Sequence, residues 1–340
     1  MNSQPHINIR DLKAGEFIDG IYSLVNPQTA VTRGGKCYFK ALIRDATGEA
    51  AARKWTFEES HLQDVSATGY ARVVGRVELY NGQNQIVLDQ IQGVEVSAED
   101  LVSLLPTTRK NIAEMFSGVT TLLHSMNDPG MRALAEAYLT DEPMMAAFRH
   151  APAATNVHHA WIGGLLEHTN QLMHLADRML PLYPELNRDI VLLGLFLHDL
   201  GKTVDLEWEK GFKFTMDGQL IGHLVRGAIW LQLKAALAAR SSGIRLSNEV
   251  VTVLQHILIS HHGQLEHGAA KLPSTPEAIF VALLDNLEAK TTISIHAVAR
   301  ERLHAGNAEF TERIWSLDSR MYRPDPLNPV DSHTGVALQS

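Results

Sequence analysis

The chain has 340 residues, of which 45 % are hydrophobic, so it is long enough for about two or three domains with sizeable cores. This composition excludes an intrinsically disordered chain and a collagen-like repeat, and the single cysteine, Cys37, excludes a disulfide scaffold. The formal net charge of −8 argues against a generally basic coat for nucleic acid. The unusual feature is the count of 17 histidines, whose positions need an explanation.

The first residues, Met1–His6, have neither the basic nor the apolar region of a signal peptide. The longest apolar stretch lies near Ile190–Leu197 and is much shorter than the ~20 residues of a membrane span. We therefore expect no membrane partner and a cytoplasmic location.

Residues 7–96 have the pattern of strands and turns. Apolar and polar residues alternate in five segments, Phe17–Val25, Lys36–Arg44, Ala50–Phe57, Ala71–Leu79 and Gln85–Leu88. Turn sequences such as Asn81-Gly82 separate them. Five short strands predict a small closed barrel, and the best candidate is the OB-fold, which binds oligonucleotides on one face.

Helical spacing begins at Asn111 and continues through most of the remaining chain. The predicted helices are Asn111–Met126, Pro129–Leu139, Glu142–His150, Val157–Leu180, Asn187–Leu200, Gly222–Ala239, Ser247–Ser260 and Pro276–Ala299. The predicted fold class is therefore a five-stranded OB-fold barrel followed by an all-α helical bundle. We expect a barrel domain over 1–97, a helical linker region over 98–150, the main helical domain over 151–322 and a flexible tail over 323–340.

The informative histidines lie within or at the ends of apolar helices. They are His168, His198 beside Asp199, His223, and His261 beside His262, and Asp285 follows on the last helix. Burial of an ionisable group on such a helix is costly unless the group is paired or bound to a metal. Single side chains from several helices can converge on one point inside a bundle. The pattern therefore predicts a metal site.

Neutral imidazole and carboxylate ligands suit Mn, Fe, Co, Ni and Zn. The order of the residues predicts two divalent ions that share Asp199 as a bridge. One ion would be held by His168, His198, Asp199 and Asp285, and the other by Asp199, His223 and His261. A water that bridges two such ions loses a proton near neutral pH and becomes a nucleophile. Whether His262 is also a ligand stays open.

These residues resemble the HD-domain superfamily of metal-dependent phosphohydrolases, whose pattern is a histidine, then His-Asp, then a distal aspartate. The flanking segments Leu197–Lys202 and Ile259–Gly263 agree with that pattern. The further histidines His223 and His261 match its dinuclear subgroup. The resemblance implies an HD domain over 151–322.

With a predicted OB-fold ahead of an HD domain, nearly the whole chain is similar to the YhaM-type 3′→5′ exoribonucleases. The segments 158–169, 285–290 and 310–315 are similar to the signatures of that family. The resemblance implies the release of 5′-mononucleotides from the 3′ end of single-stranded RNA, with DNA as an alternative substrate. It also implies Mn as the first metal to expect.

On this hypothesis a metal-bridging hydroxide attacks the phosphodiester in line. Lys202 holds a phosphate oxygen as a point charge, or is a solvated residue after a helix end. His158 and His159 donate to the phosphate or leaving group, or pack behind the metal ligands. Asn286 orients Asp285 or contacts substrate.

The barrel is expected to present the single strand to the metals. Tyr38 and Trp55 are candidate stacking residues, and stacking is worth about 1–3 kcal/mol per base. Alternation places Tyr38 and Phe39 on opposite faces, so only one of the two can face a ligand. Lys36 supplies positive charge nearby. The competing interpretation is that such aromatic residues are core and the charges are solvated.

Other functions stay open at this point. They are an HD-type nucleotidase or cyclic-nucleotide phosphodiesterase, a di-iron oxygenase, and a non-catalytic binding module with a structural metal cluster. The predicted barrel favours a nuclease, because a nucleotidase has little use for an oligonucleotide platform. Apolar helical segments such as Ile229–Leu237 pack internally or against another subunit, so a homo-oligomer is also open.

Overall fold

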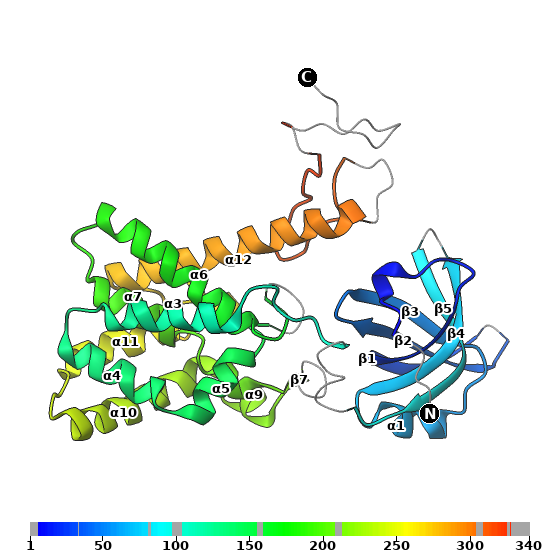
Figure 1. The fold of residues 1–340 in the computed structure, drawn as a ribbon, viewed down its shortest axis with the longest axis horizontal. Coiled ribbons are helices and arrows are strands. Elements are labelled where there is room, and N and C mark those ends of the chain that lie inside the picture. Colours follow the sequence, from blue (N-terminus) through cyan, green and yellow to red (C-terminus); the bar gives the residue numbers. More distant parts are fainter. Residues whose placement is uncertain are drawn as a thin grey trace.

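A computed structural model of the chain describes residues 6–32, 34–80, 83–96, 104–154, 159–207, 213–303, 309–324 and 327. Figure 1 shows a β-barrel on one side and a bundle of helices on the other. The predicted division at residue 97 falls among residues 97–103, which lie outside the described residues, as does most of the predicted tail.

Five strands form the barrel, which closes in the order β1-β2-β3-β5-β4. They are β1 (Phe17–Val31), β2 (Cys37–Asp45), β3 (Gly48–Lys54), β4 (Tyr70–Tyr80) and β5 (Gln83–Gly93). The pair β3 and β5 is parallel and the other pairs are antiparallel. Short helical turns, η1 (Ile9–Asp11), η2 (Glu59–His61) and α1 (Leu62–Ser66), complete this part. The predicted OB-fold is confirmed.

Strand β1 is longer than the alternation predicted, because it pairs with two neighbours. Residues 17–23 pair with β4, and residues 23–31 pair with β2, with a bulge between Val25 and Gln28. A bulge interrupts the alternation and lets a strand bend around a barrel. Inward side chains such as Ile18, Phe39 and Ile86 are fully buried in the barrel core.

Asp45 fixes the end of β2 to the N-terminal turn. Its buried carboxylate accepts hydrogen bonds from the backbone N–H groups of Ile9 and Thr47, at 2.7 Å each, and lies 3.0 Å from His6 Nε2. Burial alone would raise the pKa of Asp45, but the hydrogen bonds from His6, Thr47 and Ile9 hold it below its usual value.

We therefore expect Asp45→Asn to lower the free energy of unfolding of the barrel by about 1–3 kcal/mol at pH 7. Because the folded pKa is depressed, this contribution is present above pH ~4 and is lost as the pH falls through the folded pKa. Urea unfolding at pH 7 and pH 3 measures the difference, with the exposed Asp11→Asn as the control. Equal unfolding free energies for the two variants at pH 7 would contradict this role.

The bundle contains α3 (Ile112–His124), α4 (Pro129–Leu139), α5 (Glu142–His150), α6 (Gly164–Met179), α7 (Arg188–Leu197), α8 (Lys202–Asp205), α9 (Met216–Leu220), α10 (Gly222–Ser242), α11 (Asn248–Ser260) and α12 (Pro276–Leu303). Two 3₁₀ turns, η3 (Leu180–Leu182) and η4 (Leu265–His267), and a two-stranded sheet of β6 (Leu206–Glu207) and β7 (Lys213–Phe214) lie between them. Side-chain caps, such as Asn111 on α3 and Asn187 on α7, accept the first free N–H groups and fix the helix starts.

Helix α6 begins at Gly164, later than the predicted start at Val157. Gly163 adopts φ +78°, in the left-handed region, so the helix does not extend back through it. A Cβ on Gly164 would lie 2.0 Å from the carbonyl oxygen of His159, so the preceding loop folds directly over the helix start.

One core runs through the whole bundle. Val119 of α3 and Phe148 of α5 belong to the same buried cluster as Leu172 of α6 and Phe196 of α7. The described part of the predicted linker region therefore packs as part of the bundle. Among the residues that the structure describes, no helix has the length and apolar character to cross a membrane.

Helix α10 keeps an apolar stripe on its outer side. Val225, Ile229, Leu233 and Leu237 follow one another at four-residue spacing and are each more than 40 % exposed. Such a stripe is typical of an interface. The homo-oligomer stays a prediction.

Candidate metal centre

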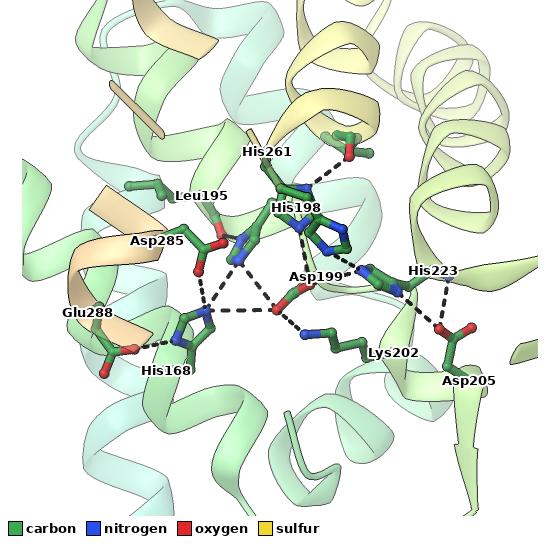
Figure 2. Close-up of polar contacts among 12 residues, drawn as sticks. His168, Leu195, His198, Asp199, Lys202, Asp205, His223, His261, Asp285 and Glu288 are labelled. Carbon is green, nitrogen blue, oxygen red and sulfur yellow. Dashed lines mark hydrogen bonds and ion pairs between the residues drawn. The ribbon is translucent and has the colours of Figure 1, made fainter. Parts of the chain in front are cut away.

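Five helical segments bring the predicted ligands to one place, as Figure 2 shows. His168 comes from α6, His198 and Asp199 follow the end of α7, and His223 comes from the start of α10. His261 follows α11, and Asp285 lies on α12. His168, His198, Asp199 and His261 are buried. The side chains of His223 and Asp285 are 15 % and 18 % exposed, so the centre reaches solvent at these two residues.

Asp199 lies between two pairs of histidines. Its Oδ2 lies 3.4 Å from His198 Nε2 and 3.8 Å from His168 Nε2. Its Oδ1 lies 3.4 Å from His223 Nε2 and 3.5 Å from His261 Nε2. Asp285 Oδ1 is 3.2 Å from His168 Nε2. Each carboxylate oxygen of Asp199 therefore faces its own pair of ring nitrogens.

The ends of α7 and α11 orient two of these rings. His198 and His261 are the C-cap residues of those helices, where the last carbonyls lack a helical partner. His198 Nδ1 lies 2.7 Å from the carbonyl oxygen of Leu195, and His261 Nδ1 lies 2.9 Å from that of Leu258. A carbonyl accepts only, so each Nδ1 carries the proton and each Nε2 presents a lone pair to the centre.

The arrangement fits a divalent cation. Among the residues that the structure describes, Asp199 Oδ1 has no hydrogen-bond partner, although it is buried, and the Nε2 atoms of His168 and His198 lie only 3.3 Å apart. Burial opposes ionisation of Asp199, but the Lys202 ammonium group holds its pKa well below the usual range. Burial likewise opposes ionisation of Asp285, and the neighbouring His168 lowers its pKa. The two carboxylates and four inward ring nitrogens form a donor set for a divalent metal ion.

Lys202 and Gly201 complete the segment after Asp199. Lys202 Nζ is 2.7 Å from Asp199 Oδ2, and its side chain is 16 % exposed. Gly201 lies directly against α10, because a Cβ at this position would come within 2.4 Å of the carbonyl oxygen of His223 and 2.7 Å of its Cα. The absence of a side chain at Gly201 therefore lets His223 approach Asp199.

We expect Gly201→Ala to displace His223 and to reduce divalent-metal binding and activity together. The added methyl group meets backbone that cannot move alone, and overpacking of this kind costs about 1–3 kcal/mol. Mn²⁺ titration and thermal unfolding measure the two effects. The control is Gly48→Ala, whose Cβ makes only an ordinary contact, at 3.7 Å from Ile9. Unchanged Mn²⁺ affinity in Gly201→Ala would contradict the proposed close approach.

The other residues predicted for this centre differ from the ligands in their positions and contacts. His159 is 1 % exposed and lies behind His168, with its Nε2 2.8 Å from Glu288 Oε1. Of its two expected roles, this position favours packing behind the metal ligands. His158 lies outside the described residues. Asn286 is exposed beside Asp285. His262 Nε2 lies 3.3 Å from His223 Nε2. His223, His261 and His262 therefore form a further group of residues that could hold a metal ion.

Two carboxylates around the centre were not singled out from the sequence. Glu288 Oε2 lies 2.7 Å from His168 Nδ1, and Asp205 Oδ2 lies 3.1 Å from His223 Nδ1. A usable signal exists for Glu288, which follows Asp285 by three residues and so shares its helix face. Asp205 reaches His223 only through the short turn of α8, which the sequence pattern did not indicate.

Tyr38 and Trp55, the predicted stacking residues of the barrel, lie on its outer face together with Arg53 and Tyr80. The rings of Tyr38 and Trp55 lie 5.4 Å apart. The Arg53 guanidinium lies over Trp55 and Tyr80, at 5.7 and 5.4 Å from the two ring centroids. We call Tyr38, Arg53, Trp55 and Tyr80 the aromatic face.

Side-chain burial separates this face from the barrel core. Trp55 and Tyr80 are exposed, and so is Lys36, which lies two residues before Tyr38. Phe39 and Phe57 are buried and contact each other in the core. The aromatic face is therefore accessible to a ligand, whereas Phe39 and Phe57 are not.

Comparison with known proteins identifies the family to which the chain belongs. Residues 165–290 match the HD domain family. A 3'-5' exoribonuclease YhaM of Bacillus pumilus is 31 % identical over 91 % of this chain and 96 % of its own length. The YhaM protein of a Geobacillus species is 30 % identical over 92 % of this chain and 93 % of its own length. Among solved structures, the second OB-fold domain of replication protein A from Methanococcus maripaludis matches 27 % of this chain and 96 % of its own, at 17 % identity and a TM-score of 0.20. The identity to the YhaM proteins, held over almost the whole of both chains, shows that this chain belongs to the YhaM 3'-5' exoribonuclease family.

Proposed function

We propose that this protein is a metal-dependent 3′→5′ exonuclease that hydrolyses the phosphodiester bonds of single-stranded RNA to 5′-mononucleotides. The observation that carries the proposal is Asp199, whose two carboxylate oxygens each face a separate pair of histidine nitrogens. The names of the relatives support the substrate and the direction. Single-stranded DNA is a second substrate to test.

The donor set supports two ions with Asp199 between them. His168, His198 and Asp285 lie on the Oδ2 side, and His223 and His261 lie on the Oδ1 side. Mn²⁺ is the first metal to test, and Fe, Co, Ni and Zn accept the same ligand types. When bound, such ions stabilise charge on the attacking and leaving oxygens and supply a nucleophile from water at neutral pH.

Lys202 supplies a positive charge at the edge of the centre. Its ammonium group is held against Asp199 Oδ2 and still reaches solvent. A phosphate group that enters beside Asp199 would therefore meet Lys202 as a point charge. His159 and Glu288 lie behind His168 and stabilise the ligands rather than contact the substrate.

The aromatic face of the barrel is proposed to hold the single strand. Stacking on Tyr38, Trp55 and Tyr80 is tolerant of sequence, since every base has a π face, and Arg53 and Lys36 add positive charge for the backbone. This local arrangement allows a chain with a net charge of −8 to bind a polyanion.

A substrate panel tests the reaction class. Labelled single-stranded RNA, the same sequence as DNA, 5′-nucleotides and cyclic nucleotides are incubated with the Mn²⁺-loaded protein, in air and without oxygen. We expect hydrolysis of the oligonucleotides at equal rates in both atmospheres. Preferential hydrolysis of mononucleotides or cyclic nucleotides, or turnover that needs oxygen, would contradict the proposal.

A further inference from the structure

Glu288 joins three donors in a buried position behind the metal centre. The residue lies on α12 and is 2 % exposed. Its Oε2 lies 2.7 Å from His168 Nδ1, and its Oε1 lies 2.8 Å from His159 Nε2. Thr292 Oγ1, one helical turn further along α12, also donates to Oε1 at 2.8 Å. A buried carboxylate with this many donors has one orientation.

His168 differs from His198 and His261 in the partner of its Nδ1. His198 and His261 use carbonyls at helix C-termini, which are free to accept. His168 lies inside α6, where the carbonyls of the preceding turn accept the N–H groups of the helix itself. The acceptor beside His168 Nδ1 is instead a carboxylate from another element, Glu288 on α12.

We propose that Glu288 is a positioning residue that holds His168 in the tautomer with the proton on Nδ1. Nε2 then presents its lone pair toward Asp285 and Asp199. His159 and Thr292 fix the Glu288 carboxylate in turn, which gives the buried His159 a positioning role rather than a catalytic one. The inference rests on the proposed role of His168 as a metal ligand. Histidine ligands of metals commonly donate their second N–H to a carboxylate in this way.

Glu288→Gln tests the inference through metal binding. The amide replaces one acceptor oxygen by an NH₂ group, which cannot accept the proton of a histidine N–H. We expect the affinity of the full-length chain for Mn²⁺, measured by equilibrium dialysis, to fall about 10- to 100-fold at one site. The control is Glu142→Gln, an exposed change of the same kind in the first turn of α5, which should leave the affinity unchanged.

A spectroscopic measurement covers the case in which Glu288→Gln does not fold. Nitrogen-15 NMR of the unchanged chain, loaded with diamagnetic Zn²⁺ and labelled at histidine, reports which ring nitrogen of His168 carries the proton. We expect Nδ1, with a proton protected from exchange. Protonation at Nε2, or equal Mn²⁺ affinity in Glu288→Gln, would overturn the inference.

The two proposals fail in different ways. If the unchanged chain binds Mn²⁺ and degrades RNA while Glu288→Gln binds equally well, only the positioning role is wrong. If the unchanged chain binds neither Mn²⁺ nor Zn²⁺, the metal centre itself is wrong and the positioning role falls with it.

Discussion

Asp199→Asn is expected to remove measurable exonuclease activity and at least one of the bound metal ions. The amide has nearly the same volume, but it lacks the charge and presents only one acceptor to two pairs of histidine nitrogens. Metal ions supply several kcal/mol of transition-state stabilisation, so the rate should fall by more than about 10³-fold. Hydrolysis of labelled RNA and the metal content after dialysis measure the two losses.

The matched control for this variant is Asp177→Asn. Asp177 lies on α6, the helix that carries His168, but its side chain is 38 % exposed and pairs with Arg188 at the surface. Surface ion pairs contribute about 0–1 kcal/mol, so this variant should keep its metal and its activity. An Asp199→Asn protein with full metal content and full activity would refute Asp199 as the bridging ligand.

Alanine at Tyr38, Trp55 and Tyr80 together is expected to weaken the use of single-stranded RNA. Each stacked base is worth about 1–3 kcal/mol, so loss of the three rings should raise KM by at least about 10²-fold, with little change in kcat. Hydrolysis of a small phosphodiester, bis(p-nitrophenyl) phosphate, needs only the metal centre and should not change. Steady-state kinetics with both substrates, under the same salt concentration, measure the contrast.

An exposed aromatic residue outside the barrel provides the comparison. Tyr183 lies in the helical bundle and is 47 % exposed, so Tyr183→Ala should leave both substrates unaffected. If the triple variant binds and degrades RNA as well as the unchanged chain does, the aromatic face is not the strand-binding site. An equal loss on both substrates would indicate damage to the fold instead.

The sequence predicted the fold class well, because each part of the chain carries one clear periodicity. Alternation located all five strands, but it placed the end of β1 at Val25 instead of Val31, since the bulge after Val25 reverses the alternation. Helical spacing located α6, but it could not detect that Gly163 adopts a left-handed φ and begins the helix late. Local backbone conformation of this kind leaves little trace in an apolar pattern.

The candidate site was likewise predictable in its residues but not in the directions of their side chains. Residues with a characteristic spacing, such as His198 beside Asp199, were found because a metal centre needs those side chains at helix ends. The direction in which a side chain points was not predictable. The sequence left two roles open for His159, substrate contact or packing behind the ligands, and its ring turns toward Glu288. Tyr38 differs from Phe39 only in which side of β2 it occupies. Both outcomes depend on packing between elements far apart in the chain.

The most direct test of the whole account is digestion of single-stranded RNA that carries a label at its 5′ end, with Mn²⁺ present. We expect a ladder of labelled products that shortens one nucleotide at a time from the 3′ end, with release of 5′-mononucleotides. Early release of the labelled 5′ nucleotide, cleavage at internal positions, or intact RNA would contradict it.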